Sequence, residues 1–307
     1  MFSNVRYYSE YFVSGIAYFA ARIFRQTMNS SLTPIEPITQ LSPLVCRILG
    51  ANASPLTLQG TNTYLVGSGK SRILIDTGEA NVSKYLVDLR AALKGDDISC
   101  IICTHWHDDH VGGVEAIIKK IIGHSVPVYK MHDVRVNEDS QKYEYVKHNQ
   151  VIKAEDATLR VLATPGHTMD HICLYLEEEN SLFSGDCILG EGTCIFEDLY
   201  TYMKSLSLLL DLKPQRIYPG HGPVVEDAVE RISSYIIHRN SREQEILEYM
   251  QSSGTVTSFD IVRVIYKKIP LAVKIAASNN VVHHLVKLIK EGKVEEVSSG
   301  LYRLIPS

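Results

Sequence analysis

The sequence predicts a layered α/β protein, in which β-sheets are covered by helices, followed by a smaller domain of helices and a β-hairpin. The chain has 307 residues, 45% hydrophobic and 21% charged, enough to bury a sizeable core in one large domain or two ordinary ones. This composition excludes a wholly disordered chain, a coiled coil and a polytopic membrane protein. From Leu44 on, short β-rich runs alternate with helical stretches and then cluster, and after residue 253 the pattern changes to helices and a hairpin.

The amino-terminal residues 1–43 are expected to be a leader followed by a flexible lead-in. Residues 1–27 are aromatic-rich, with three arginines, no lysine and one acid, which favours a mitochondrial presequence and a matrix location. The apolar stretch Tyr11–Phe24 is shorter than the ~20 residues of a spanning helix, so no stable membrane partner is expected. Two alternatives stay open: an uncleaved membrane anchor or secretory signal, or translation from Met28, which would give a cytosolic protein.

The β-rich runs and helical stretches place a first folded domain at residues 44–230. Two stretches, Ser83–Leu93 and Gly112–Ile122, have apolar residues at helical spacing. The β runs are rich in branched and aromatic residues, and several end in loops that contain glycine. These runs are Val45–Leu49, Thr63–Val66, Ile73–Ile75, Cys100–Cys103, Leu159–Leu162, His171–Leu176 and Ile217–Tyr218.

The last part of the chain, residues 231–307, is expected to form a winged-helix-like domain. A long helix over Val225–Met250 leads into it, and Thr257-Ser258 is a good N-cap pair for a helix through Tyr266. A third helix over 271–290 and a hairpin of residues 293–304 complete the plan of a common nucleic-acid binder.

The net charge of -4, from 31 Lys and Arg against 35 Asp and Glu, excludes a protein that is basic throughout and coats nucleic acid. The charge is unevenly spread. Three arginines against one glutamate give residues 1–27 a charge of +2, and eight cations against four acids give residues 253–307 a charge of +4, so residues 28–252 carry -10. The basic tail would attract phosphates. A structural lid whose lysines only solvate its surface is the alternative.

A dense cluster of polar side chains follows the strand Ile98–Cys103. The sequence there is THWHDDHVGG, residues 104–113, with three histidines and two aspartates in six residues, just past a strand and just before a helix. Imidazole and carboxylate groups together suit zinc or another borderline first-row metal. Trp106, the single tryptophan of the chain, is expected to pack beneath this loop.

This motif resembles the signature of the metallo-β-lactamase-fold hydrolases, and three later loops supply further polar groups in family order. They are TPGHT at 164–168, SGD at 184–186 and YPGHG at 218–222. The resemblance implies an αββα sandwich in which strand-end loops meet at one edge. The sequence is most similar to the animal β-lactamase-like protein 2 group, over about residues 44–300. The strings that carry this similarity are LQGTNTYLVG at 58–67, ILIDTG at 73–78, FSGDCILGEGT at 183–193, FEDLY at 196–200 and HRNSREQ at 238–244.

The family resemblance implies a site for two zinc ions, with a hydroxide between them as the nucleophile. Asp186 is expected to bridge both ions, and Asp109 to orient the hydroxide as well as to bind metal. One zinc would be held by His105, His107 and His167, and the second by Asp109, His110 and His221.

Four further residues are site candidates. Asp76 ends a strand, and it is either an aspartate that hydrogen-bonds the ligand loop and orients an imidazole or a plain turn residue. His171 could donate a proton to the leaving group or, as the favoured role, brace a ligand. Arg239 and Arg242 could clamp a phosphate, but a salt bridge on the helix surface with a nearby glutamate is equally expected.

Membership of the β-lactamase-like protein 2 group implies a mitochondrial, zinc-dependent endoribonuclease that prefers single-stranded RNA. The rival within the fold is a glyoxalase-II-like thioester hydrolase, because the same ligand motifs occur there. A third hypothesis is a non-catalytic nucleic-acid or scaffold protein with a vestigial metal site, and the presence of all seven candidate ligands argues against it.

Overall fold

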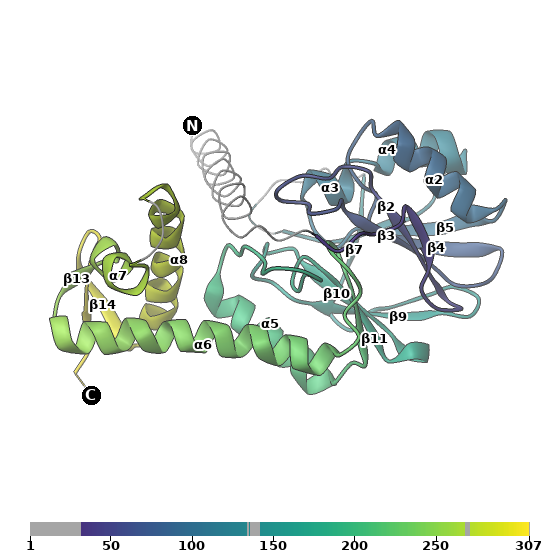
Figure 1. Ribbon diagram of the computed structural model, residues 1–307. Coiled ribbons are helices and arrows are strands. Elements are labelled where there is room, and N and C mark those ends of the chain that lie inside the picture. Colours follow the sequence, from purple (N-terminus) through teal and green to yellow (C-terminus); the bar gives the residue numbers. More distant parts are fainter. Residues whose placement is uncertain (1–31, 134, 136–141, 268–270, 307) are drawn as a thin grey trace. The chain divides into compact units, whose positions relative to one another are not determined.

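The computed structural model describes residues 32–133, 135, 142–267 and 271–306 (Figure 1). The predicted leader at residues 1–27 lies outside these residues. The chain divides into two compact units, residues 32–235 and the part from Ile236 onward. Within the described part of the chain, no helix is long and apolar enough to cross a membrane.

The first sheet of the larger unit has seven strands in the order of the sequence. Strands β1 to β4 pair antiparallel, whereas β4 to β7 pair parallel, with helices in the connections from β4 to β5 and from β5 to β6. The strands are β1 (Ile38–Gln40), β2 (Val45–Leu49), β3 (Asn62–Val66), β4 (Ser71–Ile75), β5 (Asp97–Ile102), β6 (Val128–Met131) and β7 (Glu144–Val146).

The second sheet has five strands in the order β12-β11-β10-β9-β8. Its neighbours are antiparallel except for β11 and β12, which run parallel because α5 (Leu199–Leu212) connects them. The strands are β8 (Val151–Lys153), β9 (Thr158–Ala163), β10 (Ile172–Leu176), β11 (Ser181–Gly185) and β12 (Arg216–Pro219).

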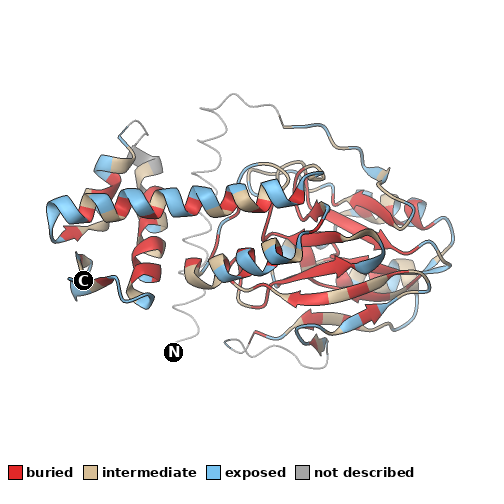
Figure 2. Cartoon of the chain, turned by 90° about the horizontal axis from the view of Figure 1, so that it is seen from below, coloured by how far each residue is buried: buried red, intermediate tan, exposed pale blue. Residues whose placement is uncertain are grey.

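Apolar residues on both faces of the first sheet produce the layers. In β4, Ile73 and Ile75 pack into the core between the two sheets, whereas Leu74 points to the opposite face. There it packs with Leu89 of α2 (Ser83–Leu93), which covers this sheet from outside. Strand residues alternate between faces, so a strand buried on both sides needs apolar residues at successive positions. The buried strands of both sheets are visible in Figure 2, and the α/β layers agree with the predicted sandwich.

The segment after the histidine-rich loop differs from the single helix expected at 112–122. A short helix α3 (Asp108–Val111) is followed by α4 (Val114–Ile117) and a π-helical turn at Ile118–Ile122. Gly113 separates the two short helices, and a side chain there would overlap the backbone oxygen of Thr77. Close packing of this turn against the chain after β4 therefore requires glycine.

The carboxy-terminal unit contains the expected helices and hairpin. Helix α6 (Ala228–Ser253) is continuous through residue 235, so both the predicted boundary at 230 and the division between the units fall inside a helix. A three-stranded sheet of order β13-β15-β14 completes the unit. The remaining elements are β13 (Val256–Thr257), α7 (Ser258–Ile265), α8 (Leu271–Lys290), β14 (Val294–Ser298) and β15 (Leu301–Leu304).

The predicted start of α7 is formed by a reciprocal cap. Asp260 N donates to Thr257 Oγ1 over 3.2 Å, and Thr257 N donates to Asp260 Oδ2 over 3.0 Å. This capping box satisfies backbone groups that the first turn leaves without partners. Ile246, Val281 and Tyr302 then pack the helices and the hairpin on one core.

Candidate metal centre

The structure brings the candidate ligands of four separate loops together at one edge of the two sheets. The loops follow β5, β9, β11 and β12, so each ligand stands just beyond a strand end. The backbone joins the sheets at this edge, because Ile172 N at the start of β10 donates to Thr104 O after β5. Seven side chains offer metal-binding atoms in two groups: His105, His107, His167 and Asp186, and then Asp109, His110 and His221.

In group one (His105, His107, His167 and Asp186), three imidazole nitrogens point at a common centre. His105 Nε2 and His107 Nδ1 are 2.9 Å apart, and His167 Nε2 lies 3.3 Å and 3.2 Å from them. Nitrogens bound to one tetrahedral zinc ion at 2.0–2.1 Å would be separated by about 3.3 Å. The spacing of these nitrogens therefore fits a single ion of that size.

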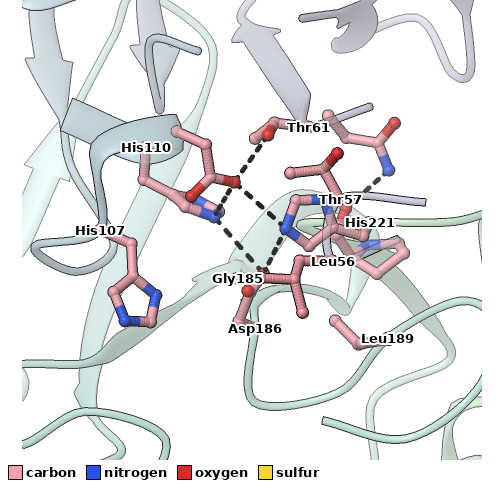
Figure 3. Close-up of polar contacts among 12 residues, drawn as sticks. Leu56, Thr57, Thr61, His107, His110, Gly185, Asp186, Leu189 and His221 are labelled. Carbon is pink, nitrogen blue, oxygen red and sulfur yellow. Dashed lines mark hydrogen bonds and ion pairs between the residues drawn. The ribbon is translucent and has the colours of Figure 1, made fainter. Parts of the chain in front are cut away.

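In group two (Asp109, His110 and His221), a carboxylate faces two imidazoles, those of His110 and His221, which are labelled in Figure 3. Asp109 Oδ2 lies 3.2 Å from His110 Nε2 and 3.3 Å from His221 Nε2. Thr61 Oγ1 donates to the same carboxylate oxygen over 2.7 Å. The threonine hydroxyl thus holds Asp109 in place from outside the group.

The carboxylate of Asp186 faces both groups. Its Oδ1 lies 3.3 Å from His221 Nε2 and 3.5 Å from His110 Nε2, while its Oδ2 lies 3.7 Å from His167 Nε2. Both His110 Nε2 and Asp186 Oδ1 are buried and make no hydrogen bond with the described residues. Buried polar atoms without partners are costly, and a bound cation would satisfy them. The donor set therefore fits two metal ions joined through Asp186.

The outward nitrogens of four of these histidines donate hydrogen bonds, so the inward nitrogens are the ones that can bind a metal once they carry no proton. The acceptors of two of them are backbone carbonyls: His167 Nδ1 lies 2.6 Å from Ile195 O, and His221 Nδ1 lies 3.3 Å from Gly60 O. The acceptors of the other two are side chains, Thr104 Oγ1 for His105 Nδ1 at 3.0 Å and Asp76 Oδ2 for His110 Nδ1 at 2.8 Å. Such contacts select the tautomer that can bind a metal.

The two groups differ in their affinity for protons. Burial, and after it the neighbouring histidines, holds the pKa of His105 well below its usual range, and burial together with His167 lowers the pKa of His107 to about 3. Burial acts in the same direction on His221, but the carboxylates of Asp186 and Asp109 outweigh it and raise its pKa to about 10. Without metal, the imidazoles of His105 and His107 are therefore neutral, whereas that of His221 holds a proton that a cation would displace.

Asp76 contacts the ligand loop directly. It is 2% exposed, its Oδ1 accepts from Thr104 N over 2.8 Å, and its Oδ2 accepts from Thr104 Oγ1 over 2.9 Å as well as from His110. Its backbone is left-handed, with φ of 59°, an uncommon conformation for a residue other than glycine. This turn at the end of β4 directs the carboxylate toward the loop after β5, so Asp76 orients the His110 imidazole.

His171 lies where it can only brace the centre. The side chain is fully buried, and its Nε2 accepts from Asp186 N over 3.1 Å while its Nδ1 lies 2.8 Å from Thr164 Oγ1. The proton therefore sits on Nδ1, and both ring nitrogens are engaged. The geometry therefore contradicts a proton-donor role for His171: both ring nitrogens are hydrogen-bonded, and the imidazole holds the backbone of the bridging aspartate, which is the bracing role.

Trp106 does not pack beneath the ligand loop, contrary to expectation. The side chain is 36% exposed, and its ring makes an edge-to-face contact with His107, with centroids 4.6 Å apart and an interplanar angle of 69°. The residues on either side of it, His105 and His107, both offer their imidazole nitrogens to group one. The chain bends at residues 104–106, so the neighbouring side chains point in different directions and the indole lies toward solvent.

The two arginines proposed as phosphate contacts lie on α6 in the carboxy-terminal unit. Arg242 Nη1 forms a 2.6 Å ion pair with Glu245 Oε2, and the guanidinium lies 4.4 Å from the centroid of the Tyr266 ring. Arg239 is 6% exposed. The alternative of a salt bridge on the helix surface therefore describes Arg242, and a buried guanidinium such as Arg239 does not present itself to a phosphate.

Three residues near the centre were not recognised in the sequence. Thr61 donates to Asp109, and Lys130 forms a fully buried 2.6 Å ion pair with Asp170, which lies in the same loop as His167. Nothing in the sequence distinguishes Thr61 from the other threonines near it. Lys130 on β6 and Asp170 are forty residues apart in the sequence, so no local pattern connects them. Only the folded sheet brings these groups together.

Comparison with known proteins agrees with this geometry. Residues 56–221 match the model of the metallo-beta-lactamase superfamily, and residues 257–303 match the beta-lactamase associated winged helix domain. The chain is 49% identical to the beta-lactamase-like protein 2 homolog of Caenorhabditis elegans, over 86% of this chain and 90% of that protein. It is 33% identical to the atrochrysone carboxyl ACP thioesterase of Aspergillus chevalieri, over 91% and 92%.

Among solved structures, a beta-lactamase domain protein from Burkholderia ambifaria shares the fold, with a TM-score of 0.74 at 18% identity over 90% of this chain and 96% of that one. The predicted αββα sandwich with a carboxy-terminal winged helix is thereby confirmed. With its two groups of histidine and aspartate ligands, the chain belongs to the metallo-beta-lactamase superfamily of metal-dependent hydrolases.

Proposed function

We propose that the protein is a zinc-dependent endoribonuclease that cleaves single-stranded RNA at this centre. The observation that carries the proposal is the pairing of two ligand groups through Asp186, in a chain whose sequence resembles the animal β-lactamase-like protein 2 group along most of its length. Two adjacent cation sites suit a phosphodiester, whose attacking and leaving oxygens both need stabilisation.

The donor set defines what each side chain would do. Two zinc ions held by the groups would supply Lewis acidity and lower the pKa of an attacking water toward neutrality. Asp109, held by Thr61, would accept a hydrogen bond from that water and align it with the phosphorus. Asp76 would hold the His110 imidazole in position during the reaction, and His171 would hold the backbone of Asp186.

The carboxy-terminal unit contributes less positive surface than its net charge suggests. Lys287 pairs with Glu243 and Glu291 at 2.6 and 2.7 Å, and Arg303 pairs with Glu295 at 2.6 Å. These cations are already neutralised by neighbouring acids. We therefore assign the winged helix a weak, general attraction for RNA, through exposed cations such as Arg263, rather than base recognition.

Thioester hydrolysis is the second candidate function. It is favoured by the 33% identity to an ACP thioesterase over nearly the full length of both chains. Apolar side chains are also exposed close to the ligands, such as Ile195 at 50%, whose carbonyl accepts from His167. An acyl chain could lie against such side chains.

The two functions are separated by incubating the full-length protein with single-stranded RNA and with S-lactoylglutathione, each with and without chelator. Chelator-sensitive cleavage of RNA that Asp109→Ala abolishes is the expected result. Asp88→Ala, which removes a carboxylate from the outer helix α2, serves as the matched control and should cleave normally. Thioester turnover with intact RNA would reject the nuclease, and the absence of both activities would support a vestigial site.

We further propose that the protein acts in the mitochondrial matrix. The proposal rests on the arginine- and serine-containing, acid-poor residues 1–27 and on the group resemblance. Amino-terminal sequencing of the protein from isolated mitochondria tests it. A new amino terminus after residue 27 is expected, and an intact Met1 would exclude a cleaved presequence.

A further inference from the structure

Trp106 is an aromatic side chain placed directly beside the metal ligands yet open to solvent. It stands between His105 and His107, whose nitrogens face the centre of group one, and 36% of its surface is exposed. The edge-to-face contact with His107 occupies at most one face of the indole. The ring is thus held at a defined position relative to the ligands, and part of it remains uncovered.

Two described cations close to the same loops, Lys130 and Arg135, are already paired. Lys130 is buried against Asp170, and Arg135 forms ion pairs with Asp133 at 2.6 Å and with Glu197 at 2.9 Å. Glu197 is in turn attached to the ligand loop, because its backbone N donates to the carbonyl of His167 over 3.1 Å. Neighbouring phosphates of a bound strand would therefore gain little from these two cations, and a contact of another kind can help the metal centre to position the strand.

We propose that the exposed face of Trp106 stacks against a nucleobase next to the scissile phosphodiester, an inference that rests on the proposed ribonuclease function. Stacking on an aromatic ring tolerates any base, because every base has a π-face. It requires an unpaired base, since the bases of a duplex are already stacked on one another. Trp106 would therefore determine both the position of the strand and the preference for single-stranded RNA.

The chain provides its own probe, because Trp106 is its single tryptophan. Zinc-loaded, full-length protein is mixed rapidly with oligoadenylate, so that the tryptophan fluorescence is recorded before cleavage. Quenching is expected with oligoadenylate but neither with an abasic strand of the same length nor with an oligoadenylate–oligouridylate duplex. Equal quenching by the abasic strand would overturn the proposal, because it would assign the signal to the sugar-phosphate backbone.

Variants give an independent readout. Trp106→Ala should weaken oligoadenylate binding by about 5- to 150-fold, as for other aromatic stacking positions, and raise KM more than it lowers kcat. Trp106→Phe keeps an aromatic face and should restore most of the affinity. Val87→Ala removes an apolar side chain that is 65% exposed on helix α2, and it should bind oligoadenylate like the wild type.

The outcomes separate this inference from the function on which it rests. Chelator-sensitive RNA cleavage without quenching, or with unchanged affinity of a folded, zinc-replete Trp106→Ala protein, would overturn the stacking role and leave the nuclease intact. Quenching by S-lactoylglutathione in a protein that does not cleave RNA would overturn both. If Trp106→Ala fails to fold, the quenching pattern of the wild type still decides the question.

Discussion

Replacing Asp76 by asparagine tests whether this buried carboxylate controls one half of the metal centre. Asp76 accepts three hydrogen bonds, from Thr104 N, Thr104 Oγ1 and His110 Nδ1, at 2.8, 2.9 and 2.8 Å. An asparagine amide keeps one oxygen and presents an NH₂ group where the other oxygen was. In either amide orientation, at least one of these donors meets another donor.

The structure indicates both the size and the selectivity of the effect. A hydrogen bond to a charged acceptor contributes about 1.5–3 kcal/mol, and losing a partner of a metal-binding histidine typically weakens metal affinity by about 10- to 100-fold. His110 belongs to group two (Asp109, His110 and His221), so Asp76→Asn should weaken mainly the second zinc. The first zinc is expected to change less, because Asp76 touches His105 only through Thr104.

Competition between the metal-free protein and a chromophoric chelator measures both zinc affinities. Asp88→Asn is the matched control, because Asp88 pairs with Lys84 on helix α2. A second zinc bound by Asp76→Asn as tightly as by the wild type would refute the orienting role. Equal weakening of both ions would also refute it, since it would indicate general damage to the fold.

Three further predictions concern packing, charge and protons. Gly220→Ala places a methyl group on the bridging carboxylate and should abolish binding of two zinc ions per chain, as counted by elemental analysis. Glu243→Ala removes the 2.6 Å partner of the buried Lys287 and leaves Glu291 at 2.7 Å, so it should cost about 1.5–3 kcal/mol in a denaturant titration, against about 0–1 kcal/mol for Glu295→Ala in an exposed pair. A change in unfolding free energy below 1 kcal/mol would contradict that reading. His221 has its pKa raised to about 10 by the two aspartates, so the second zinc must displace its proton. As the pH falls below about 10, the affinity of the protein for the second zinc should therefore fall about tenfold per pH unit for each proton that the ion displaces. Binding of the second zinc that does not change with pH would contradict this expectation.

The ligand loops could be predicted from the sequence because two local signals coincide there. Histidine and aspartate at the end of an apolar strand indicate a ligand such as a metal ion. Glycine beside them indicates that the backbone passes close to that ligand or to another segment. Residues 164–168, 184–186 and 218–222 each carry both signals. Strand ends of a layered α/β fold meet at one edge, so the convergence of these loops follows from the fold class.

Contacts between distant strands could not be predicted in the same way. Strand β6 (Val128–Met131) was not recognised at all, so nothing connected Lys130 with Asp170. The outward position of Trp106 also escaped prediction, because a tryptophan is usually buried and its direction depends on the course of a loop. The role of Asp76 could not be decided from the sequence, because it depends on a left-handed turn that no local pattern marks.

The most direct test of the account follows zinc content and RNA cleavage in the same titration. Metal-free protein is titrated with zinc, the bound ions are counted per chain, and the opening of a circular single-stranded RNA is measured at each point. Little cleavage is expected with one ion, followed by a steep rise as group two fills and a maximum at two ions per chain. Full cleavage with a single ion, or an intact circle with both sites filled, would contradict this prediction.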